Sequence, residues 1–367
     1  MQLIFWHNLV SPHQAPYMRE LALAGHSVTV VAAEAMSEER RRLGWTVPSL
    51  GPARVILGPE QGQVTQIVET SGADSVHLIA GARGTALGRQ VALACRANGR
   101  RMGIVTESPD PRGLRGLLRW TKYAAERLSI GRHFEFILAM GQKGVTWFEH
   151  CGYPKTAIFP FAYVTDRLAD DAQPEFQDAF RFVFAGQLIP RKGVDVLLRA
   201  FKEVPGAQLE IVGEGASREL LHNLASSLGI ASRIVWSGKM DGASVQSRIG
   251  NADVFILPSR EDGWGAVVNE ALMAGVPVIC SSACGASELI RHPWLGSVFR
   301  VNDVTSLTQA MNECRHRGKL SAALRQQIAG WAQCISGQNV ARYVEAILHH
   351  VYQQAPRPDA PWRATSS

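Results

Sequence analysis

Short apolar runs alternate with helix-length amphipathic stretches along most of the chain. In the first half, the runs that predict strands are Leu3–Phe5, Ser27–Ala32, Ser75–Ile79, Gly103–Thr106, Phe136–Ala139 and Ala157–Phe159. The stretches between them predict helices, for example Gln14–Ala24, Thr85–Asn98 and Gly141–Cys151. The first half therefore predicts strands and helices in regular alternation.

The second half repeats this alternation from residue 182 onward. Its predicted strands are Phe182–Ala185, Leu209–Val212, Arg233–Trp236, Val254–Leu257 and Val278–Cys280. Strand, helix and strand at this spacing predict parallel sheets with right-handed crossovers. Runs that are apolar throughout are typical of sheets covered on both faces.

The best candidate for a linker is residues 163–178, which are polar and acidic and lack a clear period. We therefore predict two doubly wound α/β domains, residues 1–165 and 179–338, that face one another across a cleft, with ligands at the carboxyl ends of their strands. A helix at about 339–354 can return to the first domain. The tail 355–367 contains three prolines and is expected to be disordered.

Composition narrows the class of protein only slightly. The 367 residues are 46% hydrophobic and 19% charged, which is ordinary for an α/β enzyme. No apolar run reaches the roughly 18 residues of a membrane span, and the first residues predict a strand where a signal peptide would stand. The net charge of +6 suits a phosphorylated small molecule, anionic lipid or nucleic acid alike. The six cysteines do not form two closely spaced pairs of the kind that bind zinc, so we expect no zinc.

The segment with the clearest chemistry runs from Pro258 to Pro277, directly after a predicted strand. A loop with two glycines precedes a helix predicted over residues 266–274, and amides at a helix start attract phosphate. Asp262 lies before this helix and Glu270 lies inside it. Two interpretations stay open on these residues alone. The carboxylates accept hydrogen bonds from sugar and ribose hydroxyls, or Asp262 caps the helix and Glu270 faces solvent.

This segment resembles the signature of glycosyltransferase family four (group 1), whose members have the two-domain GT-B fold. The signature has two acids eight positions apart across Gly-aromatic-Gly, then Glu-Ala and a small-Gly-x-Pro-Val stretch. Asp262 stands where the family usually has its first Glu, and the adjacent Glu261 is out of register by one. The specific motifs cover residues 182–288, whereas residues 1–160 resemble the family only in the alternation of predicted strands and helices.

A second match, residues 185–195, resembles the family loop that holds the diphosphate of the donor. Lys192 matches the diphosphate lysine, and Gln187 replaces the usual Arg. Arg191 either compensates for this replacement or faces solvent. The resemblance implies catalytic roles for Lys192 and Asp262, with Glu107 where the family has a His. It implies donor binding by Gly186, Gln187, Arg191, Lys192, Gly213, Glu214, Lys239, Met240, Asp262, Gly263, Trp264, Gly265, Ala266, Val267 and Glu270.

The first domain offers weaker candidates. Its loop at residues 8–16 lacks the family's glycines, and its strand 103–106 is followed by Glu107. Other polar residues expected near this edge are His13, Gln14, Arg83, Ser108 and Asp110.

Residues 111–130 predict a basic amphipathic helix. Its apolar positions are Leu114, Leu117, Leu118, Ala125 and Leu128, and its basic ones are Arg115, Arg119 and Lys122, with Arg112 just before. The helix docks on anionic lipid, or it packs its leucines into the core and exposes only a basic face.

The resemblance implies a retaining transfer from a nucleotide sugar to a glycan or lipid-linked acceptor, in the synthesis of a cell-surface polysaccharide or glycolipid. A UDP-sugar is favoured over GDP-mannose by frequency in the family. Lysine and loop amides would stabilise the leaving diphosphate, so we expect no metal or cofactor. The alternatives are a GT-B epimerase or hydrolase, or a nucleotide-sugar-binding protein without activity. Nucleic acid is disfavoured because no aromatic-basic ladder is visible. We expect a cytoplasmic enzyme, at or near the inner face of the membrane.

Overall fold

The computed structural model describes residues 1–42, 44–81, 85–107, 109–111, 113–165 and 179–363. These residues form two compact units. Unit 1 contains residues 1–41 and 46–165 together with the chain from residue 334 onward. Unit 2 contains residues 42–45 together with the described residues from 179 to 333. The division at residue 333 lies a few residues before the expected boundary at 338.

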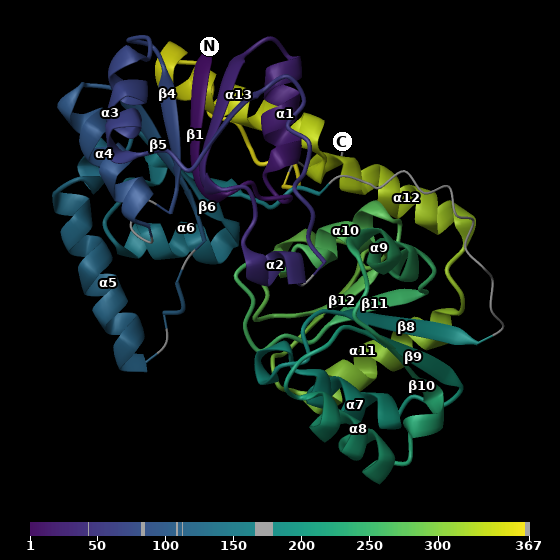
Figure 1. Cartoon of the computed structure of the whole chain (residues 1–367). Coiled ribbons are helices and arrows are strands. Elements are labelled where there is room, and N and C mark those ends of the chain that lie inside the picture. Colours follow the sequence, from purple (N-terminus) through teal and green to yellow (C-terminus); the bar gives the residue numbers. More distant parts are fainter. Residues whose placement is uncertain (43, 82–84, 108, 112, 166–178, 364–367) are drawn as a thin grey trace. The chain divides into compact units, whose positions relative to one another are not determined.

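Unit 1 is built on a parallel sheet, whose strand order over the described residues is β3-β2-β1-β4-β5-β6-β7 (Figure 1). Its middle strands are buried and almost wholly apolar, as the sequence pattern indicated. The strands are β1 (Gln2–Leu9), β2 (Ser27–Glu34), β3 (Arg54–Leu57), β4 (Val76–Ala80), β5 (Arg101–Thr106), β6 (Phe136–Met140) and β7 (Ile158–Phe161).

The helices of unit 1 lie between these strands and after residue 334. Side chains cap some of them: the Thr85 hydroxyl accepts from the Gly88 amide at the start of α4. The helices are α1 (Ala15–Leu23), α2 (Glu38–Arg42), α3 (Gln61–Thr70), α4 (Ala86–Ala97), α5 (Gly113–Leu128), α6 (Gly141–His150) and α13 (Gly337–Gln353), with short 3-10 turns η1 (Gly131–His133) and η2 (Lys155–Ala157).

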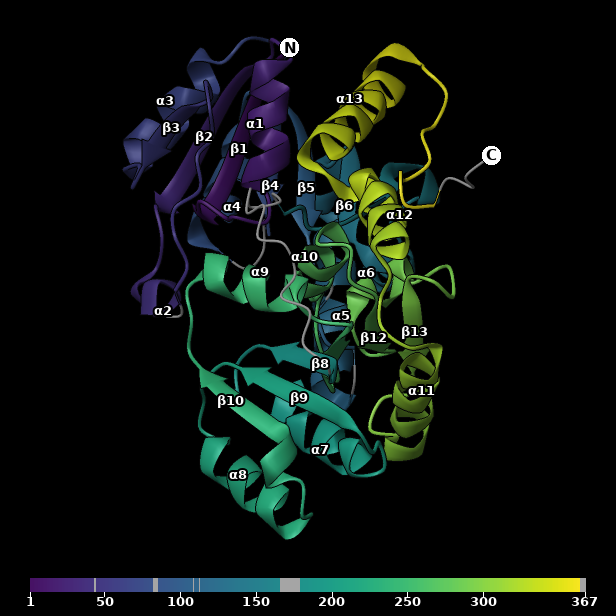
Figure 2. The same cartoon turned by 90° about the vertical axis from the view of Figure 1, so that its right-hand side faces the viewer.

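Unit 2 has a second parallel sheet, of order β10-β9-β8-β11-β12-β13. Its strands are β8 (Phe180–Ala185), β9 (Ala207–Val212), β10 (Ile234–Gly238), β11 (Val254–Leu257), β12 (Val278–Ser281) and β13 (Gly296–Phe299). Its helices are α7 (Val194–Lys202), α8 (Arg218–Ser227), α9 (Gly242–Gly250), α10 (Val267–Met273), α11 (Val304–Arg317) and α12 (Ala322–Ala332), with 3-10 turns η3 (Pro190–Lys192), η4 (Ala231–Arg233), η5 (Gly285–Leu289) and η6 (Gln333–Ile335). Helices α7, α8 and α11 cover one face of the sheet, and α9, α10 and α12 cover the other (Figures 1 and 2).

The predicted fold class, two doubly wound α/β domains, is confirmed. The analysis of the sequence did not predict two strands, β3 and β13. Both lie at sheet edges, and β3 is largely exposed. An edge strand buries too little surface to need the continuous apolar run that marks a central one.

Helix α13 belongs to unit 1, so the chain returns to its first unit after completing the second. The Tyr343 hydroxyl donates to the carbonyl oxygen of Pro160 at 3.1 Å, and the Glu345 carboxylate lies 2.8 Å from the His26 ring. Figure 2 shows α13 beside α1. No helix in the described ranges is long and apolar enough to cross a membrane.

The disordered tail that we expected over residues 355–367 is wrong for residues 355–363. Trp362 is only 1% exposed and packs edge-on against Tyr343. The Arg357 guanidinium donates to the carbonyls of Thr156 and Ile158 and lies over the Phe159 ring. The proline content misled the prediction, because one buried Trp and one bonded Arg suffice to hold this short segment. Residues 166–178 of the expected linker, and residues 364–367, lie outside the described residues.

We predict that Trp362→Ala lowers the stability of unit 1 by about 3–5 kcal/mol, because it empties a fully buried site. Thermal melting followed by near-UV circular dichroism measures the effect. Trp294→Ala, at a half-buried position in unit 2, is the control and should cost less. Equal melting temperatures for Trp362→Ala and the wild type would show that the tail contributes nothing to the fold.

Candidate donor-binding site

The predicted site of unit 2 is built at the carboxyl ends of β8 and β11, which are neighbours in the sheet. The loop after β8 includes η3 and ends at Gly193, and the loop after β11 covers residues 258–266. Adjacent parallel strands end at the same edge, so two loops distant in sequence lie together there.

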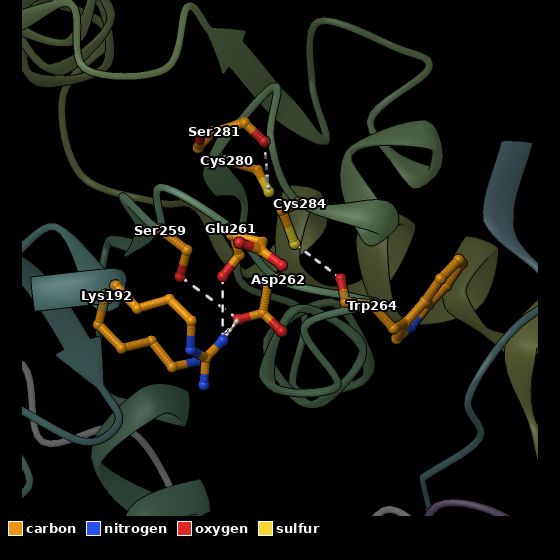
Figure 3. A network of polar contacts seen from close by, with 9 residues as sticks. Lys192, Ser259, Glu261, Asp262, Trp264, Cys280, Ser281 and Cys284 are labelled. Atoms are coloured by element: carbon orange, nitrogen blue, oxygen red, sulfur yellow. Dashed lines mark hydrogen bonds and ion pairs between the residues drawn. The ribbon is translucent and has the colours of Figure 1, made fainter. Parts of the chain in front are cut away.

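An ion pair joins these two loops (Figure 3). The Lys192 Nζ lies 2.6 Å from Oδ2 of Asp262, and both side chains are mostly buried, with 14% and 13% of their surface exposed. The Ser259 hydroxyl donates to the same carboxylate oxygen at 3.3 Å. Two residues that the sequence assigned to one site are therefore brought into direct contact.

A second contact, between the loop after β11 and the start of α7, was not predicted. The Arg260 guanidinium holds the Asp195 carboxylate with two hydrogen bonds, of 2.8 and 2.7 Å, and also donates to the Pro190 carbonyl at 2.6 Å. Burial opposes the charged form of Asp195, but the hydrogen bonds and charge of Arg260 bring the pKa of its carboxyl below the ordinary value. We call this pair the Arg260–Asp195 clamp.

Backbone contacts reinforce the clamp. The Arg260 amide donates to the Arg191 carbonyl at 2.8 Å, and the Arg191 side chain donates to the Glu261 carbonyl at 2.9 Å. Arg191 thus does not simply face solvent, although 44% of its side chain is exposed. Gly193 has a φ of 67°, and a Cβ there would collide with the Pro258 carbonyl, so the two loops touch where only glycine fits.

Loops after β8, β9 and β10 are tied at the same edge. The Gly186 amide donates to Val212 at 2.9 Å, and the Gly213 amide donates to Gly238 at 2.7 Å. Gly213 has a φ of 138°, and a Cβ there would strike the Gly186 carbonyl. The predicted residues Gly186 and Gly213 therefore bring these loops close together at the edge where the ligand is expected.

The other predicted residues of these loops are less engaged. Gln187 is half-buried in the first loop. The Glu214 carboxylate accepts from Arg218 at 2.7 Å, within the loop and helix that follow β9. Lys239 is exposed and Met240 half-buried, directly after β10. The structure places these side chains at the expected edge without joining them to the Lys192–Asp262 pair.

The Gly-aromatic-Gly loop is anchored by its tryptophan. The Trp264 side chain is fully buried and donates to Asn269 at 2.8 Å, and the Cys284 thiol donates to the Trp264 carbonyl at 2.7 Å (Figure 3). Its ring is thus part of the core, and only its backbone remains for a ligand. The Cys284 thiol, which the sequence analysis did not single out, thus helps to hold this loop.

Backbone donors of the same loop point to an anion. Helix α10 begins at Val267, so the predicted Ala266 is its capping residue. The amides of residues 263–267, which include Gly263 and Gly265, donate to no acceptor within the described residues. Unpaired amides at a helix start stabilise a phosphate group.

Glu270 is a half-buried carboxyl in α10. Burial raises the pKa of this carboxyl from 4.5 to about 7. Among the described side chains none donates a hydrogen bond to it. A desolvated carboxyl without a protein donor is typical of a ligand-binding position.

The candidates from the first half of the chain lie in unit 1. Glu107 is exposed directly after β5, and its carbonyl accepts from the Thr106 hydroxyl. Gln14 is 7% exposed and accepts from the Tyr17 hydroxyl, so it contributes to the core. His13 lies 5.5 Å from the Tyr163 ring, and burial lowers the pKa of its imidazole to about 4. Asp110 is half-buried. Arg83, Ser108 and Arg112 lie outside the described residues.

Comparison with known proteins gives a consistent picture. Residues 166–331 match the family model described as glycosyl transferases group 1. The chain is 27% identical to the GDP-mannose-dependent alpha-(1-6)-phosphatidylinositol monomannoside mannosyltransferase of Mycolicibacterium smegmatis, over 84% of this chain and 86% of the relative. It is 32% identical to the lipopolysaccharide core biosynthesis glycosyltransferase LpsD of Rhizobium meliloti, over 41% and 43% of the two chains. Residues 166–331, most of unit 2, are thus a group 1 glycosyltransferase domain.

Solved structures agree on the fold of this glycosyltransferase. The lipopolysaccharide outer core galactosyltransferase WaaB superposes with a TM-score of 0.70 at 15% identity, over 96% of this chain and 99% of that one. Anabaena HepE in complex with UDP superposes with a TM-score of 0.73 at 17% identity, over 94% and 98%. These likenesses confirm the GT-B fold. The resemblance to family four and the prediction of an enzyme are also confirmed.

We predict that Glu270→Gln stabilises the ligand-free glycosyltransferase at pH 8. A pKa raised in the folded state means that Glu270 favours folding at acidic pH, and this contribution is lost as pH rises through about 7. The amide relieves a penalty of roughly 2 kcal/mol at pH 8 and little at pH 5. Melting temperatures across this pH range measure it, with exposed Glu313→Gln as the control.

The same variant should weaken nucleotide binding about tenfold, because an amide accepts weaker hydrogen bonds from ribose hydroxyls than a carboxylate does. Isothermal titration with UDP and GDP gives this number. A variant that is both less stable at pH 8 and unchanged in nucleotide affinity would contradict the assignment of Glu270 as a ligand.

Proposed function

We propose that this glycosyltransferase binds a nucleotide-sugar donor in unit 2 and transfers the sugar, with retention of configuration, to a lipid-linked or glycan acceptor. The observation that carries the proposal is the contact of Lys192 with Asp262, in a loop whose amides at 263–267 have no acceptor among the described residues and which leads into the helix of Glu270. The group comprises a cation and backbone donors for a diphosphate and two acceptors for hydroxyl groups.

Each residue takes the role that its surroundings suit. Lys192 and the amides of residues 263–267 stabilise the charge that develops on the leaving diphosphate. Glu270 accepts hydrogen bonds from the ribose. Asp262 accepts from the sugar, and a phosphate oxygen of the donor takes the acceptor proton. The reaction so described requires no cofactor or metal, because lysine and amide groups supply the stabilisation.

The donor and the acceptor are drawn from similar proteins. A UDP-sugar is the first donor to test, in line with the HepE complex with UDP. GDP-mannose is the second, because the M. smegmatis relative, which aligns over most of both chains, is named as dependent on it. That relative acts on a phosphatidylinositol mannoside, and LpsD is named for lipopolysaccharide core biosynthesis. A lipid-linked or glycan acceptor of a cell-surface glycolipid or polysaccharide fits both.

We predict that the purified protein transfers sugar from a UDP-sugar or GDP-mannose to a lipid-linked acceptor, and that Lys192→Ala lowers kcat about 10²-fold or more. Mass spectrometry of the acceptor detects transfer, and NMR of the product reports the anomeric configuration. Release of free sugar without transfer would favour the hydrolase, and nucleotide-sugar binding without turnover would favour the non-catalytic binding protein.

Helix α5 of unit 1 supports contact with a lipid surface. Its leucines Leu114, Leu117, Leu118 and Leu128 are 56–81% exposed. The face that packs on the unit is a different one. There Trp120 donates to the His150 carbonyl at 2.9 Å, and the Tyr123 ring meets Trp147 edge-on. The interpretation in which these leucines pack into the core is therefore wrong.

The basic residues complete this surface. Arg115, Arg119 and Lys122 are exposed on the same helix. Exposed leucines beside exposed cations are typical of helices that lie in the interface of an anionic membrane. We propose that α5 holds the enzyme at the lipid surface that presents its acceptor, at the inner face of the membrane.

We predict that replacing Leu114, Leu117 and Leu118 by Ser, or Arg115, Arg119 and Lys122 by Gln, each reduces binding to anionic vesicles about tenfold or more, since both apolar burial and charge contribute. Co-sedimentation with vesicles that contain phosphatidylglycerol measures this binding. Leu220→Ser is the control, because Leu220 is 72% exposed on another helix, α8. Equal binding by all variants would remove the membrane proposal.

A further inference from the structure

Lys192 already has an anionic partner in the ligand-free protein. Its ammonium lies 2.6 Å from Oδ2 of Asp262, with both side chains mostly buried (Figure 3). Arg191 lies 4.0 Å from the same oxygen, and Ser259 donates to it. Lys192 is therefore already paired in the ligand-free protein, and a diphosphate must compete with Asp262 for its ammonium group.

The loops that carry this pair are fixed in other ways. The Arg260–Asp195 clamp, the Arg260 amide and the Arg191 side chain bind the same two loops together without using Lys192 or Asp262. Opening the ion pair then leaves the backbone in place. The exchange of partners requires only that two side chains turn, which is a small motion.

Displacing Asp262 has an electrostatic cost. The carboxylate would remain mostly buried, without its cation and close to the phosphate that replaced it. A bare nucleoside diphosphate offers no donor to this carboxylate, whereas the hydroxyl groups of a sugar can donate to it. The cost therefore differs between the donor and the product of the reaction.

We propose that Asp262 competes with the diphosphate for Lys192 and thereby makes the site prefer a nucleotide sugar over a bare nucleoside diphosphate. This proposal rests on the function proposed above. When the donor is bound, sugar hydroxyls occupy Asp262 and Lys192 holds the diphosphate. When the sugar has left, Asp262 returns to Lys192 and helps to expel the nucleoside diphosphate.

The decisive variant is Asp262→Asn, which keeps the size of the side chain and removes its charge. We expect it to bind UDP or GDP about tenfold more tightly than the wild type does, because the competitor for Lys192 is gone. Its affinity for UDP-glucose or GDP-mannose should be unchanged or lower, because the sugar loses an anionic acceptor. Isothermal titration with all four nucleotides gives the ratio of the two affinities.

The effect should depend on Lys192. If Asp262 acts by competing for Lys192, then in a Lys192→Ala background Asp262→Asn no longer tightens the binding of the nucleoside diphosphate. If Asp262 acts only by repelling the phosphate, Asp262→Asn still tightens this binding in that background. Glu261→Gln is the matched control, since it removes the same charge one residue away. A gain in that variant equal to the gain in Asp262→Asn would indicate a general effect of charge and overturn the proposal.

The outcomes separate this proposal from the proposed function. A wild-type protein that binds none of the four nucleotides would contradict the donor site itself. The other outcome is a wild-type protein that binds these nucleotides and an Asp262→Asn variant whose affinities for the nucleoside diphosphate and the nucleotide sugar fall by the same factor. This outcome would leave the donor site in place and overturn the proposed competition.

Discussion

The adjacency of β8 and β11 in a parallel sheet is the constraint on which the site depends. It places Lys192 and Asp262, 70 residues apart in the chain, within hydrogen-bond distance. The sheet sets the two loops side by side, and the Arg260–Asp195 clamp and the touching backbones at Gly193 and Pro258 hold them together. Catalysis by stabilisation of charge needs such fixed positions, because a donor that must first be ordered gives back part of its benefit.

The same site holds groups that weaken the fold in the absence of a ligand. Glu270 is desolvated without a donor from the described side chains, which is why the pKa of its carboxyl rises to about 7. The trade-off differs for Asp262, whose charge Lys192 balances in the free protein. Glu270 thus lowers the stability of the ligand-free protein. Asp262 avoids this cost by pairing with Lys192, the cation that the proposed ligand requires.

Local patterns predicted the parts of this protein that are local. Apolar runs predicted the central strands, and Lys192, Asp262 and Glu270 each lie in a short motif with a recognisable pattern. The Arg260–Asp195 clamp could not be predicted in this way, because a pairing across 65 residues leaves no trace in either segment. The order of the tail could not be predicted for a related reason. Trp362 and Arg357 lie in a proline-rich segment, whereas their partners Tyr343 and Thr156 are elsewhere in the sequence. On α5, Trp120 and Tyr123 make the contacts with the rest of unit 1, whereas the more numerous leucines are exposed.

The two departures from the family pattern, Gln187 and Asp262, lie in the two loops that the ion pair joins. Gln187 stands where similar enzymes carry an Arg, so the first loop has lost a cation that would share the diphosphate. Arg191 is the other cation of this loop, and its guanidinium donates to the Glu261 carbonyl and lies 4.0 Å from Asp262 Oδ2. In the proposed donor site, neutralisation of the diphosphate is assigned mainly to Lys192 and to the loop amides. With a single principal cation, the partner of that cation matters more than it would in a site with two. The shorter carboxylate of Asp262, in the place of the usual Glu, is the group that holds Lys192 when no donor is bound.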